Sequence, residues 1–204
     1  MRGEAPELEL RGPEFGLRFA VPADAPALME LGRDPEVVRF FSWGPYERED
    51  EPRAYVDGLA ADRAAGRQMD FLVVRLGDGA VLGVTGISEL SRRDRRAVVG
   101  TWLGRAHWGS GANAESKALV AALAFRTLGL ERLGAYAAVE NGRSRRALER
   151  LGFRPEGTRR RWHRHGERVY DVVTHSLLRD EWERSPLAAV PVEISGSPPA
   201  AWVP

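Results

Sequence analysis

Two glycines and the stretch that follows them are the part of the chain best suited to chemistry. Gly109 and Gly111 stand two positions apart, directly before a largely apolar run that ends at Leu128. Glycine lets the backbone take left-handed conformations and lie close to a ligand. A helix that begins at this turn directs its free N–H groups and the positive end of its dipole to the same point. The pattern predicts a phosphate or pyrophosphate site, although a plain strand–turn–helix corner would contain the same glycines.

The turn matches neither of the two best-known phosphate-binding motifs. A Walker A loop ends in Gly-Lys-Ser or Gly-Lys-Thr, whereas Ala112, Asn113 and Ala114 follow the second glycine here. A dinucleotide-binding turn has a third glycine and belongs to the first βα unit, whereas this turn lies past the middle of the chain.

A second polar pair, Asn141 and Ser144, stands at the expected start of a short helix. Both residue types are common helix caps, so a structural role would account for them. The chain contains no cysteine, which excludes disulfides, thiolate metal sites and a cysteine nucleophile. No serine–histidine pair is evident either. A group transfer on this chain would therefore proceed by direct attack of the acceptor rather than through a covalent enzyme intermediate.

These two regions together resemble the GCN5-related N-acetyltransferases (GNAT). The turn has the form W-G-x-G-x-N-x-E from Trp108 to Glu115, which is typical of the branch that acetylates the N-termini of ribosomal proteins (RimJ/RimL-like). The second family signature is an asparagine after a strand, followed by a helix that ends in Leu-Gly-Phe. It matches Asn141 and residues 151–153. The resemblance runs from about Leu17 to Trp182.

The resemblance implies a fold and an activity. The fold is an α+β (mixed α/β) GNAT fold with a mostly antiparallel twisted sheet of about seven strands, splayed at the acetyl-CoA site and flanked by about four helices. The activity is direct acetyl transfer from acetyl-CoA to a primary amine, first of all a protein N-terminal α-amine. Two alternatives are acetylation of a small amine, such as an aminoglycoside, polyamine or amino-acid analogue, and a non-catalytic CoA-binding module. No metal is expected.

The resemblance also assigns the donor contacts. Backbone N–H groups of the glycine turn would bind the CoA pyrophosphate, and the backbone of the strand before it would run beside the pantetheine arm and polarise the acetyl carbonyl. Asn141 would bond the pantetheine and also cap its helix. Asn113 departs from the small residue of the general motif, but asparagine tolerates left-handed conformations. The expected donor-site residues are Trp102, Leu103, Gly104, Trp108, Gly109, Ser110, Gly111, Ala112, Asn113, Ala114, Asn141 and Ser144.

The proton transfers need an acid and a base. In RimL-like enzymes a serine at the position of Ser144 lies near the CoA sulphur, so Ser144 is the expected general acid, with helix capping as the alternative. The glutamate that the family often carries on the strand before the loop is absent, because the matching run is Ala97-Val98-Val99-Gly100. Glu89 is the expected substitute as general base. Water-mediated deprotonation is an open alternative, as are four further side chains: Glu140, Asp171, His163 and His165.

Aromatic and basic residues suggest the acceptor side. Phe41, Trp43 and Tyr170 are the expected acceptor-binding residues, because the segment around Trp43 lies over the acceptor side in the resembled family. The cluster of Phe40, Phe41, Trp43 and Tyr46 could also be a hydrophobic plug between two helices. The run from Arg159 to Arg164 is either a solvated hairpin or a site for an acidic peptide or RNA, with Trp162 available for stacking. A net charge of +1 gives no general attraction for nucleic acid, which is therefore not an expected partner.

Periodicity and turn signals divide the chain into three parts. Residues 1–14 are expected to be a flexible leader and residues 15–184 the acetyltransferase domain. Residues 185–204 are expected to be a proline-rich C-terminal tail, either disordered or extended along a surface groove. Within the domain, helices are expected at 25–32, 34–41, 49–65, 112–128 and 144–151, and strands at 15–21, 69–76, 80–90, 97–103, 133–139, 153–161 and 168–178.

Composition is consistent with this reading. A hydrophobic content of 43% over 204 residues suits one domain with a core. No apolar run reaches about 18 residues, so no membrane partner is expected. The absence of cysteine and of a signal-peptide pattern suits the cytoplasm. The expected partners are acetyl-CoA and an amine acceptor, with a homodimer as a possible assembly.

Overall fold

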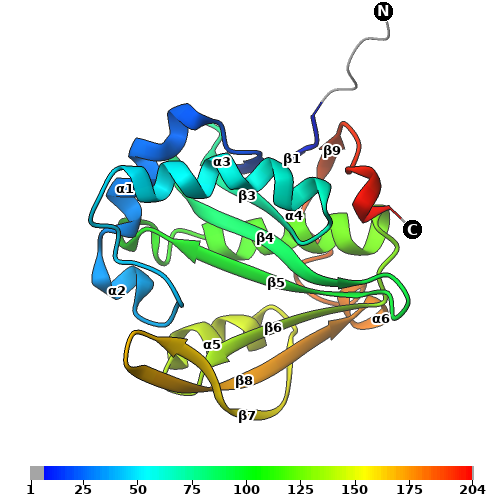
Figure 1. Cartoon of the computed structure of the whole chain (residues 1–204). Helices are drawn as coiled ribbons and strands as arrows, with labels where there is room; N and C mark the ends of the chain where they lie inside the picture. Colours follow the sequence, from blue (N-terminus) through cyan, green and yellow to red (C-terminus); the bar gives the residue numbers. More distant parts are fainter. Residues whose placement is uncertain (1–6, 204) are drawn as a thin grey trace, which may run out of the picture.

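A nine-stranded sheet runs through the computed structural model, which describes residues 7–203 (Figure 1). The strand order is β7-β8-β6-β5-β4-β3-β2-β1-β9, and every neighbouring pair is antiparallel except β5 and β6. The strands are β1 (Glu9–Arg11), β2 (Phe15–Arg18), β3 (Gln68–Arg75), β4 (Val81–Ser91), β5 (Arg96–Leu103), β6 (Arg132–Ala138), β7 (Arg154–His165), β8 (Arg168–Leu178) and β9 (Glu193–Ser195).

Six α-helices occur in the described part of the chain, and four of them have eight or more residues, which agrees with the expected number. No helix there is both long and apolar enough to cross a membrane. The helices are α1 (Ala25–Gly32), α2 (Pro35–Val38), α3 (Asp50–Ala64), α4 (Ala112–Ala122), α5 (Gly142–Arg150) and α6 (Arg179–Trp182).

The helices form two layers on the sheet (Figure 1). Helices α1 to α3 cover one face, where Leu28, Val56 and Trp102 share a core. Helix α4 packs on the other face and continues into a π-helical turn, Leu123–Thr127. The near-absence of a polar side on this helix predicts burial, and the prediction is confirmed because every residue from Ala118 to Phe125 is buried.

The one parallel pair is short, and this opens the sheet. Strands β5 and β6 pair only at Arg96↔Arg132, Ala97↔Leu133 and Val98↔Gly134. Beyond Val98 the β5 edge that faces β6 pairs with no strand of the described residues 7–203, so its main-chain groups border a gap between the two strands. Side chains alternate along β5, so that Val99 and Leu103 join the α4 core while Trp102 joins the opposite one.

The expected leader is partly wrong. Strand β1 pairs with β2 and β9, and Leu8 and Leu10 are buried. The side chain of Glu115 on α4 accepts hydrogen bonds from the main-chain N–H groups of Glu14 and Phe15. Residues 9–14 are thus fastened to the domain. Residues 1–6 of that leader lie outside the described residues.

The C-terminal tail also belongs to the domain. Of the two states expected for it, the structure shows the extended one, because β9 adds to the outer edge of β1 and Leu187 is buried. Trp202 is 1% exposed and its indole N–H donates to the carbonyl of Arg63 at 2.8 Å. Strands β1 and β9 explain why the sheet has nine strands rather than about seven.

Candidate active site

The glycine turn lies at the open end of the gap between β5 and β6. Gly109 and Gly111 have φ of 81° and 92°, the left-handed region that favours glycine. A Cβ added to either residue would meet no atom within 4 Å, so both face open space. Among the described residues, the N–H groups of Gly109, Gly111 and Asn113 find no acceptor. Free N–H groups at the start of α4 make a cradle that fits a pyrophosphate.

Trp108 fixes this loop to the sheet. Its indole N–H donates to the carbonyl of Leu103 at 2.8 Å, and the guanidinium carbon of Arg143 lies 3.2 Å from the centre of its ring. Arg143 belongs to α5, so this stacking joins the two helix starts across the gap. Because the side chains of Trp102 and Leu103 are buried in the two cores, only their main chains can serve as donor contacts.

Asn113 is turned inward rather than toward the cradle. Lys117, the chain's single lysine, is 6% exposed and donates to Asn113 Oδ1 at 3.0 Å and to Thr101 Oγ1 at 2.8 Å. Thr101 lies 2.7 Å from Thr85 Oγ1, which donates to the carbonyl of Gly100. The two N–H groups of a neutral amine are enough for this network, and burial lowers the pKa of Lys117 to about 7. The network ties the turn to β5.

Lys117 should make stability depend on pH. Burial lowers its pKa from 10.5 to about 7, so between these values the unfolded chain holds a proton that the native protein lacks. The free energy of unfolding should therefore rise with pH in this window, by up to roughly 1.4 kcal/mol per pH unit. Below about pH 7 Lys117 is protonated in both states, so it no longer makes stability depend on pH, and its destabilising effect stays at its full size.

Lys117→Met keeps the length of the side chain and removes the titrating group. Denaturant unfolding of both proteins at several pH values between 7 and 10 should show a flatter profile in the variant. Parallel profiles in the two proteins would contradict a neutral buried lysine.

Asn141 and Ser144 lie together at the start of α5. Asn141 Oδ1 accepts the Ser144 N–H at 3.1 Å, which is the capping role that the sequence allows for Asn141. The Ser144 hydroxyl makes no hydrogen bond within the described residues, so it is free to act on a ligand. The cap leaves the amide NH₂ of Asn141 available as well.

Glu89 lies at the closed end of the gap. It stands in a bulge of β4, with φ of 52°, between the pairs Ser88↔Val98 and Ser91↔Arg96. The hydroxyl of Tyr136, which lies two residues beyond the last paired position of β6, donates to Glu89 Oε1 at 3.4 Å. Burial and then Glu89 raise the pKa of Tyr136. Glu89 thus lies where β5 and β6 separate, and Tyr136 links it to β6. The sequence patterns did not indicate this tyrosine.

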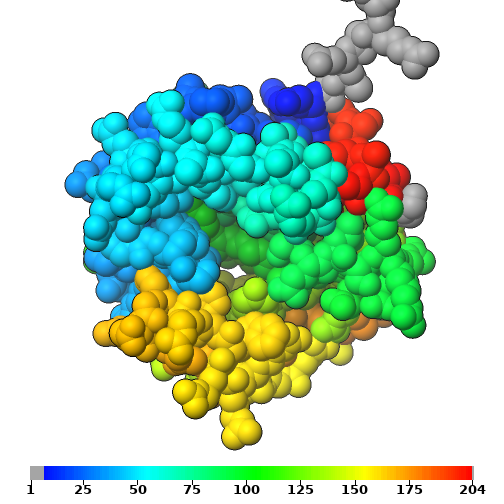
Figure 2. All heavy atoms as spheres, in the orientation of Figure 1, coloured from blue at the N-terminus to red at the C-terminus, as the bar shows by residue number. Residues whose placement is uncertain are grey.

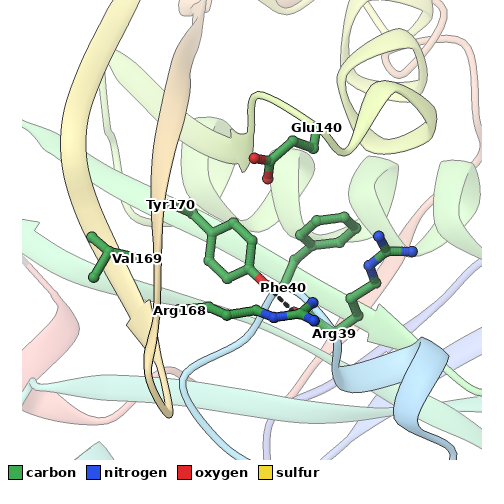
Figure 3. A pocket seen from close by; sticks show the side chains of 6 residues that line it. All are labelled: Arg39, Phe40, Glu140, Arg168, Val169 and Tyr170. Atoms are coloured by element: carbon green, nitrogen blue, oxygen red, sulfur yellow. Dashed lines mark hydrogen bonds between the residues drawn. The ribbon is translucent and has the colours of Figure 1, made fainter.

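A hollow opens on the α2 side of the gap. It measures about 420 Å³ and is lined by Arg39, Phe40, Glu140, Arg168, Val169 and Tyr170 (Figure 3). An adjoining hollow of about 260 Å³ shares Arg39, Phe40 and Glu140 and extends to Glu36, Trp108, Asn141, Gly142 and Arg143. Figure 2 shows an opening between the blue segment around α2 and the gold hairpin of β7 and β8, with the green sheet behind it. The second hollow reaches residues expected at the donor site.

Tyr170 and Phe40 line the hollow, whereas Phe41 and Trp43 do not. The Tyr170 hydroxyl donates to the carbonyl of Arg39 at 3.3 Å. The Trp43 ring packs between Tyr46 and Trp102, at centroid distances of 5.0 and 5.1 Å. The hydrophobic-plug interpretation therefore describes Trp43, whereas Phe40, another member of the aromatic cluster, lines both hollows.

The four other candidate bases, Glu140, Asp171, His163 and His165, lie in different environments. Asp171 accepts the Arg161 N–H at 2.7 Å, and His165 donates from Nε2 to the carbonyl of Gly44 at 2.8 Å, so both hold the hairpin in place. Burial and then His165 lower the pKa of His163. Glu140 alone among the four lines the hollows.

Comparison with known proteins gives the family. The profile of the acetyltransferase (GNAT) domain matches residues 14–154, which is more than half of the chain. The chain therefore belongs to the GNAT acetyltransferases, and the expected GNAT fold and N-acetyltransferase class are confirmed.

The relatives agree with this. The chain is 29% identical over 159 residues to "Uncharacterized N-acetyltransferase p20" of Bacillus licheniformis, covering 78% of this chain and 89% of that protein. It is 34% identical over 106 residues to "Putative ribosomal N-acetyltransferase YdaF" of Bacillus subtilis, covering 52% and 58%. The solved structure "Mycobacterium smegmatis RimJ in complex with CoA-disulfide" superposes with a TM-score of 0.78 at 22% identity, covering 90% of this chain and 91% of that one.

Proposed function

We propose that this acetyltransferase moves an acetyl group from acetyl-CoA directly to the N-terminal α-amine of a protein. The observation that carries the proposal is the gap between β5 and β6, which has the glycine cradle at one end. Beside it lie the two adjoining hollows that share Arg39, Phe40 and Glu140, together called the acceptor hollow. A donor anchored at the cradle and an amine entering from the hollow would meet there. Holding both reactants in place could supply several kcal/mol, within the roughly 7–11 kcal/mol reached by well-oriented reactions.

The donor is held mainly by main-chain groups. The free N–H groups of Gly109, Gly111 and Asn113 bind the pyrophosphate, and the positive end of α4 favours its charge. The unpaired edge of β5 bonds the pantetheine arm and polarises the acetyl carbonyl at Leu103, since the Gly104 N–H already donates to the carbonyl of Leu82. The amide of Asn141 adds a contact from the opposite side of the gap.

The proton transfers use side chains on both sides of the gap. Glu89, aided by Tyr136, accepts the proton that the amine must lose. Glu140 is the second candidate, because it lines the hollow next to Asn141. The Ser144 hydroxyl returns a proton to the departing thiolate. The amine attacks directly, since the chain has no cysteine to form an acyl-enzyme.

The acceptor class has separate support. The relative YdaF carries the name "Putative ribosomal N-acetyltransferase". The hollow is open to the surface at the β7–β8 hairpin, which suits the end of a protein chain. The same opening would also admit a small amine, so acceptor identity needs a direct comparison.

An acceptor panel tests this proposal. Peptides with free N-termini should be acetylated at the α-amine, while matched peptides with blocked N-termini and an internal lysine should react at least about tenfold more slowly, a difference near 1.4 kcal/mol. Free thiol release gives kcat/KM, and fragmentation by mass spectrometry gives the acetylated atom. A higher kcat/KM for aminoglycosides or polyamines would instead assign a small-molecule acceptor.

A further inference from the structure

The β7–β8 hairpin carries a local excess of positive charge. Residues 159–168 contain five arginines, two histidines and one acidic residue, Glu167, although the whole chain has a net charge of only +1. We name as the basic hairpin the residues Arg159, Arg160, Arg161, Arg164 and Arg168. Within the described residues none of the five forms a salt bridge, whereas Arg132 and Arg154 nearby pair with Glu156 and Glu181. In the part of the chain that the structure describes, these five positive charges are therefore not paired with a carboxylate at salt-bridge distance.

Two arginines line the acceptor hollow itself. Arg168 extends beneath Tyr170 toward the chain at Arg39, and Glu140 projects from the other side of the aromatic rings (Figure 3). The guanidinium of Arg39 lies 5.2 Å from the centre of the Phe40 ring and 3.8 Å from Glu36. The hollow therefore has a carboxylate on the donor side and guanidinium groups on the outer side.

The register places a third arginine on the same sheet face. Arg159 pairs with Val172, and Val172 lies four positions from Arg168 on β8. Alternate residues of a strand share a face, and so do residues directly opposite each other on neighbouring strands. The guanidinium carbon of Arg159 lies 4.4 Å from the centre of the exposed Trp162 ring on the same strand. Arg39 and Arg168 thus line the acceptor hollow, and Arg159 lies farther along the same face on the neighbouring strand.

We propose that the acceptor is a protein N-terminal segment with acidic side chains close behind its α-amine, which rests on the proposed function because it concerns the same acceptor site. The amine passes Glu140, whose carboxylate attracts an ammonium group. The carboxylates that follow meet Arg168, Arg39 and Arg159, and arginine–carboxylate pairs are strong and directional. β7 is the outermost strand of the sheet, so an extended peptide can continue along its free edge.

The charges within the hollow favour such a peptide over RNA. A polyanion would meet the guanidinium groups but also Glu140 and Glu36, and these carboxylates repel phosphate. A peptide with a positive α-amine followed by negative side chains is complementary in charge, since its amine faces Glu140 and its carboxylates face the arginines. The hollow therefore favours a ligand in which a positive charge is followed by negative charges, and a uniform polyanion does not have this order of charges.

Three peptides of one sequence test the inference. They differ only at the second to fourth residues, which are glutamate, glutamine or lysine. The acidic peptide should have the highest kcat/KM, on the order of tenfold above the glutamine peptide, and the lysine peptide the lowest. The preference should weaken as salt is raised, because exposed charges are screened. Equal kcat/KM for the three would overturn the acidic class and leave N-terminal acetylation intact, whereas no transfer to any of them would count against the proposed function.

Charge reversal at the hollow links the preference to these arginines. Arg168→Glu should lower the acidic-to-glutamine ratio by about fivefold and raise the relative rate of the lysine peptide. The matched control is Arg93→Glu, at a 95% exposed side chain in the turn between β4 and β5, which should keep the wild-type ratio. A ratio unchanged in Arg168→Glu would contradict the assignment. So would tight binding of a single-stranded RNA oligonucleotide that is lost in Arg168→Glu while peptides show no charge preference.

Discussion

Gly111→Val is expected to abolish acetyl-CoA binding while leaving the protein folded. The φ of 92° at Gly111 is strained for a branched side chain, at a cost of about 1–3 kcal/mol. The added side chain would enter the open space that the pyrophosphate needs. Acetyl-CoA at about 100 times its Kd stabilises a native protein by about 2.7 kcal/mol, and this stabilisation should disappear in the variant.

Thermal unfolding with and without acetyl-CoA measures the effect. Gly157→Val is the matched control, because Gly157 has a φ of 154°, also faces open space and lies on the edge strand β7. The control should lose some stability but keep the shift caused by acetyl-CoA. An undiminished shift in Gly111→Val would place the donor elsewhere.

Trp202→Ala is expected to destabilise the protein by about 3–5 kcal/mol, the usual cost of removing a buried tryptophan. Trp202 is 1% exposed and its indole N–H donates to the carbonyl of Arg63 in the last turn of α3. For a chain of this length each kcal/mol lowers Tm by about 2–4 °C. Such a loss would show that residues 185–204, which their composition predicts to be a tail, include a residue on which the fold depends.

Val203→Ala provides the comparison, since Val203 is 42% exposed and adjacent in sequence. Denaturant unfolding of both variants should show a loss only for Trp202→Ala, with a similar m-value in all three proteins. A wild-type midpoint for Trp202→Ala would mean that the C-terminal segment contributes nothing to the fold.

Local sequence patterns predicted the elements that lie close together in the chain. The glycine turn and α4 are continuous, so turn chemistry and apolar periodicity define both within one stretch. Asn141 and Ser144 at the start of α5 follow from the same kind of signal. Their expected roles in chemistry came from the family resemblance and stay predictions until donor binding is measured.

Features that depend on distant segments were not predictable in the same way. Strands β1 and β9 have three residues each and exist because β1 pairs with β2 and β9 pairs with β1. Three residues are too few for a periodic pattern. The acceptor hollow similarly joins Arg39 and Phe40 to Glu140 and to the start of β8, and only the completed sheet brings these segments together.

Lys117 is an intermediate case. The sequence shows a single lysine directly before the apolar run from Ala118 to Phe125, so it already indicates that Lys117 lies at the edge of the core. Its partners, Thr101 on β5 and Asn113 in the loop, required the structure.

Acetyl transfer by the purified protein tests the central claim most directly. With acetyl-CoA and a peptide that has a free N-terminus, free thiol should appear in step with acetylated peptide. With acetyl-CoA alone, mass spectrometry should show no acetyl group on the protein, because the amine attacks the thioester directly. Thiol release without any acetylated amine, or no release with any primary amine despite bound acetyl-CoA, would contradict the account.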